Sequence, residues 1–571
     1  MRPLATLGGE EQSVLLTLAV VIGAAAGGAV TVFYKTIDVI QRVVLRAATE
    51  APLPDVVLIP VTVGLGLVAC RALVRWGARG SGGENIPDVI YRVTVKGGVI
   101  PSLPVLVKTV AAAIVIGTGG SVGAEGPVVV LGAAAAFRIG RWLRVSPNRL
   151  RTLVGCGAAA GISAAFNAPI TGVIFGMEKI LGATSGPALG PFIVASILAA
   201  TVGRAVFGDH PVIALPAAFG IHTAWELLLY VALGLVTGVV AVVYSRGVWK
   251  TQDAFARLRP ALQVLLGAVL VGALDFAFHA DLWGHGHESL NIGIVASRSV
   301  TFLLALAFAK LAATALTFGA GGTGGVFTPA LFIGATLGGA CGVGASVLLP
   351  GWHIAPGAVA LVGMAGLVAG ATHAPLTAIM MVFEMTRDYG LILPLMLTSV
   401  LAYGVARRLY PESIYTEWLV RRGLVLSHGA DAAVLARTTI AECFNRRPVV
   451  VRDNATIATI LAAMLEGRQS EFPVVSAEGR LIGMIDRETV REAAESGDHL
   501  AQVVVAADLI RPHADHVTPE DSLLTALRRL GGEDVDYLPV VDPASTERLL
   551  GIVSRRDVMG AYERALSSEG H

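Results

Sequence analysis

Long apolar runs alternate with short glycine- and proline-rich breaks from about residue 13 to about residue 406. Some runs approach or reach the roughly 20 residues with which a helix crosses a bilayer, namely Val14–Val32, Ala224–Tyr244 and Thr301–Phe318. Others are shorter and interrupted, as at Leu103–Gly117, Val128–Ile139 and Ala330–Ala340. Short hydrophobic segments in corresponding halves of a chain are typical of broken helices around a site at the middle of the membrane. The pattern therefore predicts an all-α polytopic membrane protein.

Two motifs recur later in the membrane part, in the same order. GSVGAEGPVVVLGA at 120–133 aligns with GTGGVFTPALFIGA at 322–335, which matches Gly123 with Gly325. NAPITGVIFGME at 167–178 aligns with HAPLTAIMMVFE at 373–384, which matches Glu178 with Glu384. The two offsets, 202 and 206 residues, are nearly equal. We therefore predict two duplicated halves, roughly 13–210 and 224–410. These repeats alone leave open whether the halves are parallel or inverted.

The pattern changes after Arg407. From about residue 430 charged residues are frequent, and apolar residues alternate with polar ones, as in FPVVSAEGRLIGMID and YLPVVDPASTERLLGIVS. A helical pattern precedes each of these strand-pair patterns, at Ile457–Leu465 and at Leu523–Leu530. This region therefore predicts a tandem of α/β units of about 60 residues each. We expect a separate soluble domain at 430–571.

The composition agrees with a membrane location. Of the 571 residues, 54% are hydrophobic and 15% are charged, whereas soluble domains carry about 25% charged residues. The net charge of +1 gives no support for nucleic-acid binding. The four cysteines are scattered, without the spacing of a metal site or of a disulfide framework, and no cleavable signal peptide is apparent. We therefore expect an integral membrane protein without a metal site.

One carboxylate lies inside a glycine-rich turn between apolar runs, in the stretch GTGGSVGAEGPVVVLG at 117–132. Pro127 follows Glu125 at a position where proline suits the first turn of a helix. The start of such a helix points unpaired backbone N–H groups forward and attracts anions. An ionisable residue inside a membrane segment is a candidate functional residue. The alternative is an ordinary N-terminal acid in a solvated loop.

Together with FEMTRDYGLILPLML at 383–397 and Ser413-Ile414-Tyr415, these motifs resemble the CLC family of chloride channels and proton–chloride antiporters. The tail resembles a pair of CBS domains. The resemblance implies a homodimer with one pore per subunit, each built from two inverted repeats of broken helices. The expected domains are a transmembrane domain at 1–425 and CBS copies at roughly 440–495 and 508–565. The expected location is the plasma (inner) membrane, with the CBS pair in the cytoplasm.

The resemblance also implies roles for individual residues. Glu125 matches the family's gating glutamate, whose carboxylate occupies the outer anion site and competes with chloride. Protonation would remove this mimicry of an anion and open the path. The Tyr415 hydroxyl would donate to a central anion, unless Tyr415 is an interfacial aromatic residue. Backbone N–H groups would complete the sites, at the outer site those of Ala124, Glu125 and Gly126 and at the central site those of Val326 and Phe327.

The first departure from the family lies in a motif that usually reads GSGIP, whose serine hydroxyl binds the central anion. This chain reads ARGSGGENIPDVI at 78–90. Aligned on Ile86-Pro87, the serine position holds Glu84, which Asn85 follows; aligned on the glycines, Ser81 takes that role. A glutamate would repel chloride, so we expect Ser81, Asn85 or the backbone to bind the anion there.

The second departure is Lys179. In well-coupled bacterial antiporters of the family, an acid at this position relays protons from the cytoplasm, whereas this chain has Glu178-Lys179. An unperturbed lysine is already protonated at neutral pH and cannot relay protons as a carboxylate does. The alternative is that Lys179 simply extends its charged end to the cytoplasmic interface. In either case the sequence favours a channel or a weakly coupled transporter over a tightly coupled antiporter.

Other candidate residues carry weaker signals. His285 and His287 have metal-like spacing in WGHGHESL but no third ligand, so we expect no metal there. Lys108 and Lys310 lie in apolar runs and are expected to line a vestibule or to reach an interface. In the tail, a nucleotide-binding signature of CBS domains is matched by two residues of GIVSRRD, Ser554 and Asp557. An adenine nucleotide could bind at this second copy; the alternative is a purely structural tail that braces a dimer.

The combined expectation is a chloride channel of the voltage-gated CLC type, gated by Glu125, or a weakly proton-coupled transporter. Its partners would be chloride or other small inorganic anions, protons at Glu125 and membrane lipid, and it would require no cofactor. The alternative is a proton–chloride antiporter with a non-standard internal proton acceptor. A cation-coupled carrier of organic anions also uses broken-helix repeats, but the chain lacks an acidic cluster for a cation. No nucleophile–base pair or metal motif in the membrane part indicates an enzyme.

Overall fold

A computed structural model describes most of the chain. The described ranges are 11–50, 54–78, 85–94, 97–182, 189–209, 211–213, 219–220, 225–278, 281–284, 297–421, 435, 437–466, 469–495, 504–510, 515–533 and 535–569. The chain divides into two compact units, Met1–Val425 and Leu426–His571. Each unit is described by itself.

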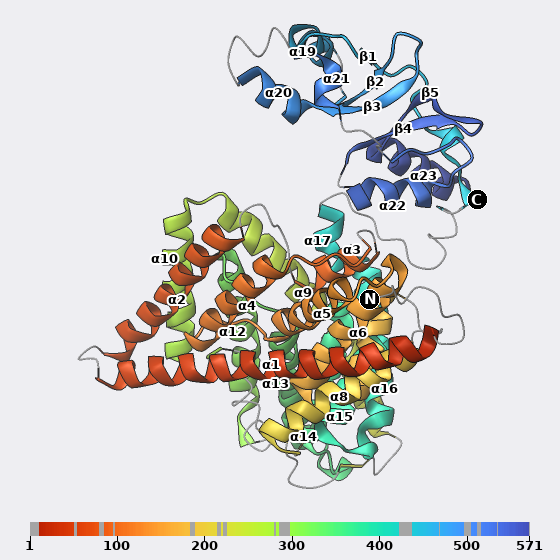
Figure 1. The fold of residues 1–571 in the computed structure, drawn as a ribbon. Coiled ribbons are helices and arrows are strands. Elements are labelled where there is room, and N and C mark those ends of the chain that lie inside the picture. The colour runs from red at the N-terminus through yellow and green to blue at the C-terminus, as the bar shows by residue number, and fades with distance from the viewer. Residues whose placement is uncertain are drawn as a thin grey trace. The chain divides into compact units, whose positions relative to one another are not determined.

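Unit 1 is built from helices (Figure 1). Its first half contains α1 (Glu11–Glu50), α2 (Asp55–Gly77), α3 (Ile86–Thr94), α4 (Ser102–Gly117), α5 (Glu125–Trp142), α6 (Pro147–Phe166), α7 (Pro169–Phe175), the π-helix η1 (Gly176–Leu181) and α8 (Leu189–Phe207). Its second half contains α9 (Glu226–Ala256), α10 (Pro260–Ala277), α12 (Val300–Gly319), α13 (Phe327–Leu348), η2 (Pro350–Trp352), α14 (Pro356–Thr372), α15 (Pro375–Thr386), η3 (Tyr389–Leu391), α16 (Ile392–Leu409) and α17 (Thr416–Arg421).

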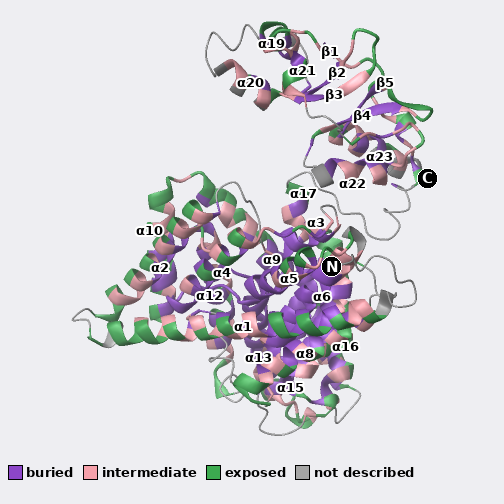
Figure 2. Ribbon diagram, in the orientation of Figure 1, coloured by how far each residue is buried: buried purple, intermediate pink, exposed green. Residues whose placement is uncertain are grey.

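Eight helical segments within the described ranges are long and apolar enough to cross a membrane. They comprise α1, α2, α8, α9, α10, α12, α13 and the segment 389–409. The outer helices α1, α2 and α10 carry many exposed residues (Figure 2), whereas burial is concentrated in α5, α6, α13 and α14. Large apolar side chains on the outer helices are exposed, among them Val32, Leu65 and Leu265. Apolar exposure of this extent is expected of a surface that faces lipid.

Both halves break at the same place. In the first half α4 ends at Gly117 and α5 begins at Glu125; in the second, α12 ends at Gly319 and α13 begins at Phe327. A glycine with positive φ follows each helix end, Gly119 at 98° and Gly321 at 84°, because this conformation is strained for other residues. The structure therefore confirms the predicted broken helices.

One sequence expectation about these helices is wrong. The segment Ala330–Ala340 was expected to be a short interrupted helix, but α13 continues to Leu348 and is long enough to span. Its glycines serve helix packing: a Cβ on Gly334 would overlap the Gly363 carbonyl of α14, and a Cβ on Gly363 would overlap the Gly334 carbonyl. In the first half, Gly132 and Gly157 bring α5 and α6 together in the same way. Close backbone approach at small residues is the usual packing of membrane helices.

Unit 2 contains two similar α/β copies. The first consists of β1 (Val451–Arg452), α19 (Ile457–Glu466), β2 (Glu471–Val475), β3 (Leu481–Asp486), α20 (Arg487–Glu495) and α21 (Ala506–Leu509). The second consists of α22 (Leu523–Glu533), β4 (Tyr537–Asp542), β5 (Ser545–Ser554) and α23 (Arg555–Glu569), after the short helix η4 (Ile440–Glu442). β1 pairs parallel with β2, while β2–β3 and β4–β5 are antiparallel. This arrangement confirms the predicted α/β tandem.

Candidate functional site

The Glu125 carboxylate joins the two repeated motifs. Glu125 is the first residue of α5 and is fully buried. Its Oε1 accepts a hydrogen bond from the backbone N–H of Phe327, and its Oε2 accepts one from the Thr328 hydroxyl at 2.9 Å. Both donors belong to the first turn of α13. A carboxylate from one half of unit 1 therefore lies at the helix start of the other half, which is favourable for a negative charge.

Glycine makes this position of the carboxylate available. Gly123 and Gly325 form an antiparallel bridge in which each N–H donates to the other carbonyl at 2.7 Å. A Cβ added to either glycine would overlap the Glu125 carboxylate. The two glycine-rich turns thus hold each other in register and leave the space that the carboxylate fills.

The other residues predicted as backbone ligands lie at the starts of α5 and α13. Ala124 is the residue before α5, Gly126 is the second residue of α5, and both are buried. Val326 is the residue before α13, and its carbonyl accepts a hydrogen bond from the Tyr244 hydroxyl at 2.7 Å. Tyr244 was not predicted from the sequence, because a tyrosine in the middle of an apolar run has no local signal for such a contact.

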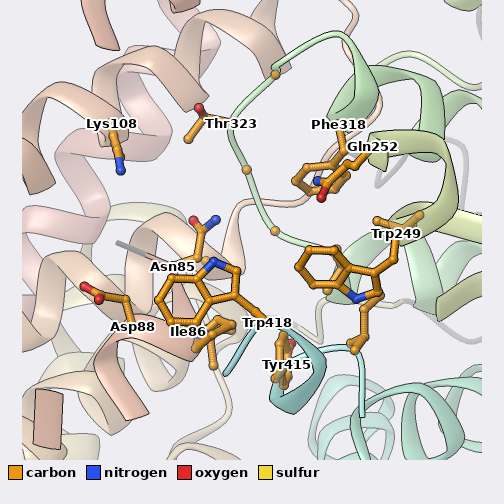
Figure 3. A pocket seen from close by; sticks show the side chains of 18 of the residues that line it. Asn85, Ile86, Asp88, Lys108, Trp249, Gln252, Phe318, Thr323, Tyr415 and Trp418 are labelled. Atoms are coloured by element: carbon orange, nitrogen blue, oxygen red, sulfur yellow. The ribbon is translucent and has the colours of Figure 1, made fainter. Parts of the chain in front are cut away.

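A cavity of about 290 Å³ adjoins the glycine-rich turns (Figure 3). Its lining includes backbone of the turns and side chains on α3, α4, α9 and α17 or directly before α3 and α17. Among them are Asn85, Asp88, Lys108, Trp249, Gln252, Tyr415 and Trp418. The cavity is therefore mixed in character, with amide, aromatic and charged groups around one space. It lies next to the turn that contains Glu125, because Gly126 is one of its lining residues.

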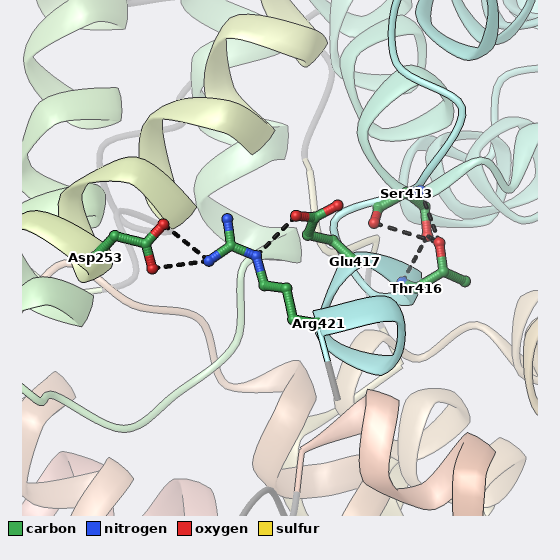
Figure 4. Close-up of polar contacts among 5 residues, drawn as sticks. All are labelled: Asp253, Ser413, Thr416, Glu417 and Arg421. Atoms are coloured by element: carbon green, nitrogen blue, oxygen red, sulfur yellow. Dashed lines mark hydrogen bonds and ion pairs between the residues drawn. The ribbon is translucent and has the colours of Figure 1, made fainter. Parts of the chain in front are cut away.

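Tyr415 reaches this cavity from a short segment that is fixed on several sides. The Ser413 hydroxyl accepts from the Thr416 N–H at 3.1 Å and so closes the start of α17, and the Ile414 N–H donates to the Ala371 carbonyl at 2.9 Å. At the other end, Arg421 bridges Glu417 and Asp253 of α9 (Figure 4). The Tyr415 hydroxyl is buried and has no hydrogen-bond partner within the described part of the chain. A buried hydroxyl of this kind is suited to donating a hydrogen bond to a ligand.

Of the two side chains that could replace the missing serine, Asn85 belongs to the described residues, whereas Ser81 lies outside them, as does Glu84. Asn85 lines the cavity, and its Oδ1 lies 3.5 Å from the point where a Cβ on Gly126 would stand. The Asn85 side chain is therefore placed beside the turn of Glu125.

Lys179 lies in the π-helix η1 and is half-buried. Its ammonium group donates to the backbone carbonyl of His373 at 2.6 Å. His373 follows the last residue of α14 in a left-handed conformation, with φ of 54°. A cation at the C-terminus of a helix is electrostatically favourable. Lys179 thus caps α14 through this contact.

The acid beside it, Glu178, takes part in an exchange between the halves. Glu178 Oε2 accepts from the N–H and the hydroxyl of Thr377 at 3.0 and 2.6 Å, at the start of α15. Its counterpart Glu384 accepts from the N–H and the hydroxyl of Thr171 at 2.7 and 2.6 Å, at the start of α7. Each half therefore closes the short helix of the other, which is what two halves related by a two-fold axis would do.

Lys108 and Lys310 prove to be counterparts, because they are 202 residues apart, the same offset as Gly123 and Gly325. Lys108 lines the cavity, whereas Lys310 donates to the carbonyls of Leu282 and Gly284 at 2.8 and 2.9 Å. The offset was available in the sequence and would have identified this pair. His285 and His287 lie outside the described residues, among which no metal-binding cluster of His, Cys, Asp or Glu occurs.

In unit 2, Ser554 and Asp557 bind each other at the start of α23. The Asp557 carboxylate accepts from the N–H and the hydroxyl of Ser554 at 2.9 and 2.6 Å, and the Asp557 N–H donates to the Ser554 hydroxyl at 3.1 Å. This is a reciprocal cap. In the first copy, Asp486 accepts from the N–H and hydroxyl of Thr489 in the matching place. Both copies thus have a closed helix start with an acid in it.

Comparisons with known proteins agree with this architecture. The family described as "Voltage gated chloride channel" matches residues 65–407, and the CBS domain matches 440–496 and 505–564. The "Putative chloride channel protein ClcB-like" of Ralstonia nicotianae is 36% identical over 418 residues, which cover 71% of this chain and 97% of the relative. The "H(+)/Cl(-) exchange transporter ClcA" of Yersinia pestis is 31% identical over 444 residues, which cover 75% of this chain and 92% of the relative.

Solved structures are similar as well. A slow cyanobacterial Cl⁻/H⁺ antiporter has a TM-score of 0.64 and 26% identity, and the match covers 72% of this chain and 97% of that chain. A eukaryotic CLC transporter has a TM-score of 0.65 at 19% identity and covers 95% of this chain and 97% of that chain. At this lower identity the second likeness concerns the fold alone.

Proposed function

This chain belongs to the voltage-gated chloride channel family, and we propose that it moves chloride along a path that the Glu125 carboxylate closes. The resemblance that the motifs indicated, to a CLC protein with a CBS pair, is confirmed by the family matches. The observation that carries the gating proposal is the contact of Glu125 with the start of α13. A carboxylate in that place is a tethered anion at a site suited to free anions.

Protonation is the step that would release this gate. A neutral carboxyl group no longer benefits from the positive end of α13 and loses its advantage over chloride. Once the side chain leaves, the N–H group of Phe327 becomes available to an anion. Gly123 and Gly325 have no side chains, so an anion could approach the same backbone closely.

The proposed ligands would bind the anion with only moderate strength. Backbone N–H groups and the hydroxyl of Tyr415 carry only partial charges, and an ion must bind well enough to enter yet weakly enough to leave. Asn85 would supply its amide N–H in place of the family's serine. Lys108 would raise the local concentration of anions in the cavity without having to touch them.

Lys179 supports a channel or a weakly coupled transporter. Its ammonium group is bound to the His373 carbonyl, so the position at which coupled relatives hold an acid has no carboxylate to accept a proton. The alternative of a proton–chloride antiporter is favoured by two similar proteins, because the relative from Yersinia pestis is named an exchanger and the solved cyanobacterial protein is named a Cl⁻/H⁺ antiporter. It would need a different internal proton acceptor.

The test is anion flux from liposomes that contain the purified protein, with external pH recorded. We expect chloride efflux that rises at low pH, and little or no uphill proton movement driven by a chloride gradient. Glu125→Gln should give flux that no longer depends on pH, because the side chain cannot carry a charge. Sustained proton pumping by the wild type would establish the antiporter, and unchanged pH dependence in Glu125→Gln would remove Glu125 from the gate.

For the tail, we propose a cytoplasmic CBS pair, in a homodimer of the plasma (inner) membrane, that binds an adenine nucleotide at its second copy. CBS domains commonly bind adenine nucleotides, and Ser554 and Asp557 form the matching signature at the start of α23. The test is thermal unfolding of the full-length protein in detergent with and without ATP. ATP should raise the melting temperature of the wild type but not that of Asp557→Asn, and an equal effect on both would assign the nucleotide to another place or to none.

A further inference from the structure

We propose that Thr328 is a positioning residue of the gate, whose hydroxyl holds the Glu125 carboxylate in the closed state more strongly than it holds chloride. The inference deepens the proposed function and rests on it, because it presupposes that Glu125 closes the path. It assigns a role in gating to a side chain of the second half, at a position where the first half has none.

The contact is direct and dry. The Thr328 hydroxyl donates to Glu125 Oε2 at 2.9 Å, while the N–H of Phe327 donates to Oε1. Glu125 is 0% exposed and Thr328 is 3% exposed, so water does not compete for either group. A hydrogen bond to a charged acceptor in such surroundings is stronger than the same bond at a surface.

The hydroxyl is available because of its place in the helix. Threonines inside α12 and α13 donate to the carbonyl four residues earlier, as Thr314 does to Lys310 at 2.9 Å and Thr336 to Phe332 at 3.0 Å. Thr328 is the second residue of α13, and the residue four positions before it, Gly324, lies outside the helix. Its hydroxyl therefore points to the carboxylate and not back along its own helix.

The arrangement matches a carboxylate better than a halide. Glu125 presents two separate acceptor atoms, one to each of two neighbouring donors, which is a bidentate contact. A halide has a single centre that both donors must share. Removal of the hydroxyl should therefore weaken the closed state more than it weakens chloride binding. In the first half the counterpart of Thr328 is Gly126, so no second hydroxyl can replace it.

The pH dependence of flux can report this contact. Among the described residues, the titratable groups that interact electrostatically with Glu125 include the phenols of Tyr34 on α1, Tyr244 on α9 and Tyr415 before α17. Phenols are ordinarily neutral between pH 5 and 8. The adjoining cavity adds the charged side chains of Asp88 and Lys108. None of these side chains donates to the carboxylate in the described structure, whereas Thr328 does.

The experiment compares chloride flux between pH 5 and 8 for wild type, Thr328→Val, Thr328→Ser and Thr336→Val in liposomes. Valine keeps the shape of threonine but has a methyl group in place of the hydroxyl. Thr336→Val makes the same change in the same helix, away from Glu125. Loss of a hydrogen bond to a charged group should destabilise the closed state about tenfold or more. The half-activating pH of Thr328→Val should thus rise by about one unit or more, while Thr328→Ser and Thr336→Val stay near the wild type.

A second readout separates the two levels of the proposal. In a Glu125→Gln background, addition of Thr328→Val should change the pH dependence no further, because the charged acceptor is gone. The inference is overturned if Thr328→Val weakens chloride binding but leaves the half-activating pH unchanged, since the hydroxyl then serves the anion. If Thr328→Val does not fold, Thr328→Ala is measured in its place against the same criterion. Failure of Glu125→Gln itself to alter the pH dependence would instead overturn the proposed gate.

Discussion

Gly123 and Gly325 have no side chains and so leave the space that the Glu125 carboxylate fills. The position of the gate therefore depends on both residues being glycine. The nearest atoms to a Cβ on Gly123 all belong to the Glu125 carboxylate, whereas a Cβ on Gly325 would also meet the backbone N–H of Gly126. A methyl group at 123 should therefore displace the gate without disturbing the backbone. The repeat in the sequence indicated that these glycines are important. It could not show that the Glu125 carboxylate fills the space where their side chains would stand.

Gly123→Ala should open the path at neutral pH. The added methyl group would overlap the carboxylate, so the closed state becomes unfavourable and chloride flux at pH 7.5 should rise severalfold and lose most of its pH dependence. Flux measurements on liposomes check this. Gly28→Ala is the control, because a Cβ there meets nothing within 4 Å. Flux of Gly123→Ala that still falls at high pH as in the wild type would contradict the overlap.

Lys179 permits a second test on a single side chain. Lys179→Glu introduces a carboxylate at the position from which coupled relatives relay protons, and we expect uphill proton movement to appear in the presence of a chloride gradient. Lys179→Met is the control: it loses the contact with the His373 carbonyl and should lower the stability by about 1–3 kcal/mol without producing proton movement. Proton movement by Lys179→Met, or none by Lys179→Glu in a folded protein, would contradict the assignment of this position.

At the scale of helices, the starts of α7 and α15 depend on acceptors from outside their own half of unit 1. Each begins with a proline at its first position and has no capping side chain of its own. Inside a membrane, unpaired N–H groups are costly because no water is present to satisfy them. Glu384 and Glu178 supply the missing acceptors from the other half. The sequence indicated that Glu178 and Glu384 are equivalent, but their exchange is a long-range contact that no local pattern contains.

Removal of either cap should cost similar stability. Glu178→Ala leaves the N–H and the hydroxyl of Thr377 without their acceptor, and Glu384→Ala leaves the N–H and the hydroxyl of Thr171 and also the N–H of Ile170. We therefore expect a loss of about 2–4 kcal/mol in the free energy of unfolding for each. Denaturant-induced unfolding in detergent measures this. Glu50→Ala, at the exposed end of α1, should change little. A loss in only one of the two variants would show that the exchange is not energetically symmetric.

At the scale of the whole molecule, patterns with a short period were predictable and contacts between distant segments were not. The glycines at 119 and 321, the paired motifs and the α/β alternation of the tail all follow from local sequence. Comparison of the halves could not identify Thr328, because its counterpart is a glycine. That comparison pointed to Phe327 and Glu125 instead. Tyr244 and the contact of Lys179 with His373 depend on which helices become neighbours, and that is set by the packing of the complete unit.

The exchange of carboxylate caps has a consequence for how such a chain can be assembled. A first half expressed alone would lack Glu384, so the N–H groups at the start of α7 would have no acceptor. Its Glu178 would have no start of α15 to cap. Cells that make the two halves as separate chains, divided between α8 and α9, should recover chloride flux only when both chains are present. Flux from the first half alone would contradict this.

The same reasoning reaches back before the duplication. An ancestral chain of half the length of the membrane part, with one segment like 167–178 and its acid, could satisfy its own helix start by lying beside a second copy. The fusion of two such genes would then have joined partners that already depended on each other. The present membrane part would be the fused form of a pair of molecules that once capped each other's helices.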